Sequence, residues 1–173
     1  MARENAPVWT VYDKLRTVRL NVKYYGRRLA SLERQNFWIE LLLATTAPSS
    51  AIAGLWVWQT ASGKEAWLGL GVLTAVVAVT KPLLGLTKRI KEFEGVLSGY
   101  RLLDFDLKQL KSRIEQKQTY NSALEADFDK ISDRERALVK DTPEPRAKQN
   151  VTKACEAEVI RELPKDHFFV PQE

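Results

Sequence analysis

Among its 173 residues the chain has only one cysteine, Cys155, and only one histidine, His167. A single thiol excludes a disulfide framework, and together the two residues exclude the usual zinc ligand sets. One histidine also leaves little room for a histidine-based catalytic centre, and we interpret Cys155 as a small packing residue. The sequence holds no GxxxxGK[ST], HExxH, GxSxG or CxxC motif. We therefore expect neither an enzyme nor a protein that binds a metal or cofactor.

The charge balance does not by itself identify a partner. The chain carries 27 Lys and Arg against 22 Asp and Glu, a net charge of +5. That excess suits a nucleic acid or a membrane surface equally well. The mean hydropathy of −0.31 is typical of a soluble protein. This average conceals a concentration of apolar residues in the middle of the chain.

Two long apolar runs predict a transmembrane hairpin. Residues 37–58 contain one charge, Glu40, and residues 67–86 contain one charge, Lys81. At about 1.5 Å per residue, the runs are roughly 33 Å and 30 Å long, enough to cross a hydrocarbon core. Tryptophans stand at their ends, where a lipid interface favours them. The alternative is a buried helical hairpin in a soluble bundle.

Basic residues set the expected orientation. Residues 1–35 carry eight Lys and Arg against three acidic residues, and Lys88, Arg89 and Lys91 follow the second run. The positive-inside rule places both termini in the cytoplasm, which in a bacterium means a multi-pass protein of the inner membrane. The first span would act as an uncleaved signal.

Heptad patterns flank the hairpin. The first runs without a break into the first span, through Val8, Val11, Leu15, Val18, Val22, Tyr25, Leu29 and Leu32. The second begins at Phe93 and Val96 and continues to Ile131, with Lys117 and Asn121 in otherwise apolar positions. These two residues either set register in one long helix or mark a fold-back near residues 116–122. Gly95 and Gly99 are weak points within this helix.

Two prolines, Pro143 and Pro145, end the second helical segment. A short charged helix over about 146–162 and a tail with Phe168, Phe169 and Val170 follow, and we expect the tail to dock on a neighbouring helix.

The predicted fold class is therefore all-α: an oligomeric membrane protein whose two transmembrane helices extend into a cytoplasmic antiparallel coiled coil or helical bundle. In chain order, the predicted parts are a cytoplasmic amphipathic helix (1–36), the first span (37–58), an external link (59–66), the second span (67–87), a cytoplasmic helical segment (88–141) and a C-terminal linker with a short helix and tail (142–173).

Polar residues within the spans are the first candidate site. An ionisable residue in a span is a functional hypothesis by default. Glu40 and Lys81 either pair across the hairpin or snorkel to the interface, or one of them faces a water-filled pore. Hydroxyls four residues apart form a stripe, with prolines as helix kinks nearby. The pore-lining candidates are Glu40, Thr45, Thr46, Ser49, Ser50 and Lys81, and the kink candidates are Pro48 and Pro82. Two spans cannot enclose a pore, so a conduit requires several copies.

A basic collar at the cytoplasmic ends of the spans is the second candidate site. It is interpreted as a contact for anionic lipid or as a ligand site for a nucleotide or oligonucleotide. Its members are Arg27, Arg28, Arg34, Lys88, Arg89 and Lys91.

The layout of the chain resembles one known family. The basic helix ending RRLASLERQNFW, the two-span hairpin with a short outer link, and the helix KRIKEFEGVLSGYRLLDFDLKQLKSRI are similar to SLATT proteins over roughly residues 8–140. This resemblance implies a bacterial two-transmembrane effector of anti-phage defence that oligomerises and permeabilises the inner membrane, causing growth arrest. It also implies a trigger, such as a nucleotide or oligonucleotide signal made by a partner nucleotidyltransferase, or a partner protein.

Two functions from different classes follow. The first is an oligomeric, channel-type effector gated through its cytoplasmic helices, with membrane lipid and further copies of itself as partners. The second is a membrane-anchored coiled-coil scaffold that recruits a partner protein and conducts nothing.

Overall fold

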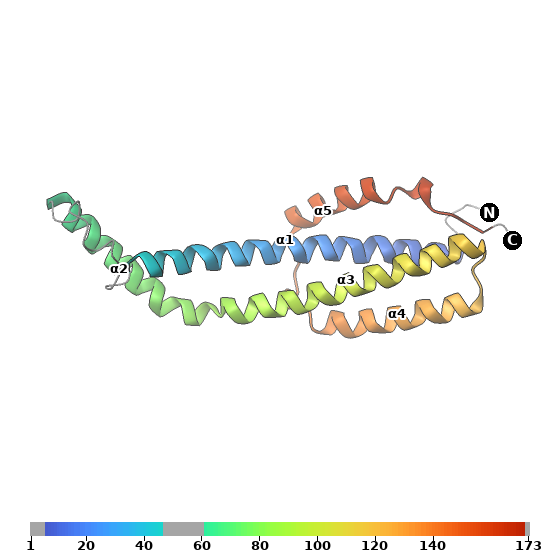
Figure 1. Ribbon diagram of the computed structural model, residues 1–173, viewed down its shortest axis with the longest axis horizontal. Coiled ribbons are helices and arrows are strands. Elements are labelled where there is room, and N and C mark those ends of the chain that lie inside the picture. The colour runs from blue at the N-terminus through green and yellow to red at the C-terminus, as the bar shows by residue number, and fades with distance from the viewer. Residues whose placement is uncertain (1–5, 47–60, 172–173) are drawn as a thin grey trace. The chain divides into compact units, whose positions relative to one another are not determined.

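The computed structural model describes residues 6–46 and 61–171 (Figure 1). Over these residues the chain forms five α-helices and one 3₁₀ helix, with no β-strand, so the all-α prediction is confirmed there. The predictions for Pro48, Ser49 and Ser50 lie outside the described residues. The elements are α1 (Trp9–Thr46), α2 (Ala61–Leu84), α3 (Leu86–Lys117), α4 (Ser122–Lys140), α5 (Gln149–Glu162) and η4 (Lys165–His167).

The chain divides into two compact units. The first, which we name the bundle unit, comprises residues 1–29 and 92–173. The second, which we name the apolar unit, comprises residues 30–91. Each unit is described separately below.

The heptad residues of α1 face inward. Of the eight predicted seam residues, seven are buried and Val22 is half-buried. The helix runs from Trp9 to Thr46 without interruption, as the pattern predicted. Side chains three and four residues apart lie on one helix face, and burial of that apolar stripe is what holds α1 in place.

The second heptad segment folds back on itself. Phe93 and the following seam residues are buried as far as Ile114, but Lys117 is exposed and ends α3. Gln118 then adopts a left-handed conformation, with φ of 52°. Asn121 caps α4, its Oδ1 accepting a hydrogen bond from the backbone N–H of Leu124 at 3.1 Å. The structure therefore selects the fold-back over the single long helix.

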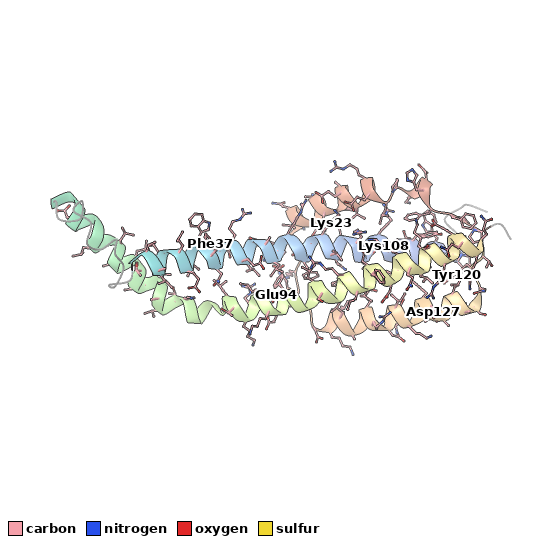
Figure 2. The ribbon with its side chains drawn as sticks, in the orientation of Figure 1. Lys23, Phe37, Glu94, Lys108, Tyr120 and Asp127 are labelled. Carbon is pink, nitrogen blue, oxygen red and sulfur yellow. The ribbon has the colours of Figure 1, made fainter. Side chains whose placement is uncertain are left out.

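Helix α4 returns antiparallel to α3 within the bundle unit. Arg113 near the end of α3 pairs with Asp127 near the start of α4 at 3.1 Å, and Figure 2 places Asp127 just after the turn that holds Tyr120. Farther from the turn, Asp106 pairs with Arg134 at 2.8 Å. The order of these contacts fixes the antiparallel arrangement.

Helix α5 and the tail pack on α1. Lys23 of α1 points toward α5 (Figure 2) and pairs with Glu158 and Glu162. Phe168 is 1% exposed, stacks on Tyr12 with ring centroids 4.4 Å apart, and meets Trp9 edge-on. The predicted docking of the tail on a neighbouring helix is confirmed for Phe168.

Helix α2 begins earlier and ends earlier than the predicted second span. It starts at Ala61, within the predicted link, and continues through Pro82 to Leu84. Gly85 then takes φ of +55°, a conformation that glycine adopts without steric cost, and α3 begins at the next residue. The sequence reading had placed no break at Gly85.

Within the described residues, no single helix is both long and apolar enough to cross a membrane. Leu68–Lys81 together with Leu86–Lys117 meets that test as a bent pair, by length and composition.

Two glycines of α3 differ in their surroundings and give a first test of the packing. A Cβ on Gly99 would lie 2.6 Å from Cδ1 of Leu138 on α4, whereas a Cβ on Gly95 meets nothing within 4 Å. We expect Gly95→Ala to raise the free energy of unfolding by about 0.5–1 kcal/mol through helix propensity. Gly99→Ala should gain nothing, because Leu138 must move.

The measurement is thermal unfolding in detergent, followed by far-UV circular dichroism. Leu138→Ala removes the side chain that a Cβ on Gly99 would meet. In that background, adding Gly99→Ala should therefore raise the free energy of unfolding relative to Leu138→Ala alone. Equal gains at Gly95 and Gly99 in the wild-type background would contradict this account of the α3–α4 contact.

Candidate functional site

Helix α2 presents an almost wholly apolar surface. Between Leu68 and Lys81 only every third or fourth side chain is partly covered, namely Leu70, Thr74, Val77 and Lys81. The other ten positions are exposed, and they are Leu, Val, Ala, Gly and Thr. Leu68 is 71% exposed and Val79 70%. A helix with one covered stripe and an apolar remainder requires a further apolar environment around it.

The same property appears on α1 within the apolar unit. Phe37 and Trp38 are exposed and meet edge to face with ring centroids 5.6 Å apart. Figure 2 shows Phe37 projecting from this part of the helix. Leu41, one turn later, is also exposed. Tryptophan is enriched where a helix passes a lipid headgroup layer.

Glu40 and Lys81 are brought together. The Lys81 ammonium donates a hydrogen bond to Oε1 of Glu40, joining α1 to α2. Lys81 belongs to the covered stripe of α2, while Glu40 keeps about half of its side chain exposed. This is the ion pair across the hairpin that was one of the two readings of these residues. Pairing lowers the cost of placing each charge on an apolar helix.

The hydroxyl stripe is described only in part. The Thr45 hydroxyl donates to the backbone carbonyls of Leu41 and Leu42, at 2.9 and 3.1 Å. Thr74 and Thr80 of α2 bond the carbonyls of Leu70 and Val76 in the same way. Such bonds satisfy the hydroxyl within its own helix. The side chains of Thr46 and Pro82 lie outside the described residues.

The basic collar separates into two groups. Arg34, Lys88, Arg89 and Lys91 have exposed side chains in the apolar unit. Arg28, by contrast, is 7% exposed, and both Arg28 and Arg27 pair with glutamates of the bundle unit. Two members of the predicted ligand site are therefore already occupied by carboxylates of the same chain.

Sequence reasoning missed how far this internal pairing extends. Basic residues of α1 meet acidic residues from each of the segments packed around it in the bundle unit. Lys14 pairs with Glu135 of α4 at 2.6 Å, and Arg19 with Asp104 of α3 at 3.2 Å. Further pairs join α1 to α5 and to the preceding turn: Lys23–Glu158, Lys23–Glu162, Arg27–Glu158 and Arg28–Glu144.

The pair formed by Arg28 and Glu144 is the most enclosed of these. Nε and Nη2 of Arg28 donate to the two carboxylate oxygens of Glu144, at 3.0 and 2.9 Å, a bidentate geometry. The hydroxyl of Tyr24 donates to Oε2 at 2.7 Å and accepts from the backbone N–H of Lys148 at 2.9 Å. The guanidinium also lies over the ring of Phe93, 5.9 Å from its centroid. This network ties the turn before α5 to α1.

The network sets the protonation of Glu144. Burial by itself would raise its pKa, but the hydrogen bonds from Arg28 and Tyr24 outweigh that effect and lower the pKa below its ordinary value of 4.5. Burial raises the pKa of Tyr24, and it raises the pKa of Tyr100, whose ring stacks on that of Tyr25, to about 12. At neutral pH Glu144 is therefore a carboxylate, and Tyr24 is the neutral phenol that donates to it.

A metal or nucleophilic centre is not evident in the described part of the chain. No group of three or more His, Cys, Asp or Glu side chains there is placed to hold a metal ion. Cys155 is buried, and burial raises the pKa of its thiol. A raised pKa keeps a thiol protonated and unreactive.

Comparison of the chain with protein-family models, with curated proteins and with solved structures finds no match.

Replacing Glu144 tests the enclosed pair. Glu144→Gln leaves the Arg28 charge without its carboxylate in a largely buried position, so we expect the free energy of unfolding to fall by about 2–4 kcal/mol at pH 7. The pKa of Glu144 is lower in the folded state than its ordinary value of 4.5. The stabilisation that its ionised carboxylate provides is therefore fully present above pH 4.5 and is lost as the pH falls through the folded-state pKa. The difference between wild type and variant should therefore shrink below pH 4.5.

The measurement is chemical unfolding in detergent at pH 7 and at pH values below 4.5. The matched control is Asp133→Asn, which removes an ion pair with Arg136 whose two side chains are 72% and 81% exposed, and which should change stability by less than about 0.5 kcal/mol. The enclosed Arg28–Glu144 pair would be refuted as a source of stability if Glu144→Gln lowered the free energy of unfolding no more than Asp133→Asn does. An effect of Glu144→Gln that does not change with pH would refute it as well.

Proposed function

We propose that this chain is an oligomeric inner-membrane pore or channel-type effector, gated through its cytoplasmic helices. The observation that carries the proposal is the apolar surface of α2, exposed at ten of the fourteen positions from Leu68 to Lys81. Lipid, together with further copies of the same apolar helix, would remove such a surface from water. The lengths and compositions of the runs at 37–58 and 67–86 support lipid.

A conduit needs polar groups at membrane depth, and the Glu40–Lys81 pair supplies them. In an assembly of several copies the pair repeats around the axis, and its partly exposed carboxylate offers a polar ring along the conduit. Rings of charged side chains are a common means of selecting ions. The bundle unit, joined to these helices by α1 and α3, is the element through which gating would act.

The biological role rests on the resemblance to SLATT proteins. On that basis, opening of the pore depolarises the membrane and arrests growth of a bacterium under phage attack, in response to a nucleotide or oligonucleotide signal or to a partner protein. Arg34, Lys88, Arg89 and Lys91 would contact anionic lipid at the cytoplasmic surface.

A second candidate function is a membrane-anchored scaffold that recruits a partner protein without conducting. The bonds of the Thr45 hydroxyl to its own helix favour this alternative, because a hydroxyl satisfied in that way has no need of water in a pore. The two functions make opposite predictions for the hydroxyl stripe.

The first experiment measures membrane potential in cells after induction of the protein. If the chain is a pore, the wild type depolarises the cells, and replacing Thr45, Thr46, Ser49 and Ser50 by Val or Ala reduces the effect at least tenfold. A scaffold tolerates this replacement. The matched control is replacement of Thr10 and Thr17 on α1 in the bundle unit, which leaves the spans unchanged. Equal depolarisation by the stripe variant and the wild type would remove these hydroxyls from the conduit.

The second experiment measures ion selectivity in planar bilayers. Lys81→Leu leaves the negative charge of Glu40 alone and should shift the reversal potential toward cation preference. Glu40→Leu leaves the positive charge of Lys81 and should shift it toward anion preference. Chemical cross-linking checks that both variants still assemble. Reversal potentials equal to that of the wild type in both variants would place the pair outside the pore.

A further inference from the structure

The C-terminal segment of the bundle unit has an unusual balance of forces. We name residues 142–171 the arm; it comprises the proline-containing turn, α5, η4 and the residues around Phe168. In the arm the buried apolar side chains are Cys155, Val159 and Phe168. Helix α3 buries eight apolar side chains between Phe93 and Ile114. Because the burial of apolar side chains is the main favourable contribution to such packing, the arm is the more weakly held of the two.

Charge supplies most of the other contacts of the arm. Glu144 is bound to Arg28 and Tyr24, Glu158 to Lys23 and Arg27, and Glu162 to Lys23. The side chains of Arg27 and Glu162 are 42% and 48% exposed, so their ion pairs are weak and are screened by salt. The Arg28–Glu144 pair is the one largely enclosed ion pair of the arm that the structure describes.

Contacts at the other end of the arm reach both long helices of the bundle unit. Phe168 stacks on Tyr12 of α1, and the ammonium of Lys111 on α3 lies 5.8 Å from the centre of its ring. The Tyr12 hydroxyl donates to the carbonyl of Phe169 at 2.6 Å. The docked arm thus contacts α1 near Trp9 and Tyr12 at one end and from Lys23 to Arg28 at the other, and it touches α3 near Lys111.

We propose that the arm is a releasable clamp. The whole arm detaches from α1 in a single step, while α1, α3 and α4 remain folded. Segments with few buried apolar contacts open at lower free energy than the core to which they are attached. Release removes the cover from Trp9 and Tyr12 and frees the charges of Lys23, Arg27 and Arg28. The proposal stands on the contacts of the bundle unit and does not depend on conduction.

The chain carries its own reporter for release. Cys155 is the single cysteine, lies on the face of α5 that meets α1, and is 0% exposed. A thiol reagent reacts with it only when the arm is open. The rate of reaction of the full-length protein in detergent with 5,5′-dithiobis(2-nitrobenzoic acid) therefore measures opening, and a Cys155→Ser variant gives the background.

We expect the rate to rise at least tenfold in the Glu144→Gln/Glu158→Gln variant, and to rise with potassium chloride concentration in the wild type. The control is Asp127→Asn/Asp106→Asn, which removes the same number of carboxylates from α3–α4 ion pairs outside the arm and should leave the rate unchanged. Hydrogen exchange followed by mass spectrometry under the same conditions should show loss of protection in α5 with protection retained in α1, α3 and α4.

Two results would overturn the proposal. One is a labelling rate that neither the arm variant nor salt increases. The other is a rate that rises only together with loss of protection in α3 and α4, since the arm would then open by unfolding of the whole bundle unit. The Phe168→Ala variant, which keeps every ion pair of the arm, gives an independent check and should also label faster than the wild type.

Discussion

The bundle unit depends on helix α1, which satisfies two requirements at once. Its heptad residues are buried in the interior, and its basic residues pair with carboxylates on α3, α4, α5 and the turn that precedes α5. Apolar burial supplies most of the free energy, while charge pairs that reach each surrounding segment determine which side of α1 that segment occupies.

The sequence was sufficient to predict the parts of the fold that follow from local periodicity. The spacing of apolar residues from Val8 to Leu32 identified the buried face of α1, and seven of the eight residues are buried. The same pattern continues from Phe93 to Ile131, and Lys117 and Asn121 interrupt it between those two residues. Choosing between a long helix and a fold-back required the observation that Asn121 caps α4. An asparagine just before an apolar helical run is itself a sequence signal for a helix start, and it would have favoured the fold-back.

The features that the sequence did not predict are those that join distant residues. Glu144 lies between two prolines in a segment interpreted as a linker, and its partner Arg28 is 116 residues away. No periodicity connects these two positions. For the same reason Arg27 and Arg28 were interpreted as part of a contact for lipid or ligand, although both pair with glutamates of the same chain. Among the long-range contacts, only the one between Glu40 and Lys81 was suggested by the sequence, because each is the single charge of its apolar run and the two could pair across the predicted hairpin.

The pairing along α1 also limits which of its basic residues are available to a charged ligand. Binding to a polyanion is driven by the release of counterions from the polyanion as basic side chains neutralise its phosphates. An arginine that already contacts a carboxylate neutralises a phosphate only after giving up that partner, so it contributes little to such binding. While the arm is docked, Lys23, Arg27 and Arg28 are held by carboxylates of the arm, so these three residues contribute little to any attraction of the bundle unit for nucleic acid.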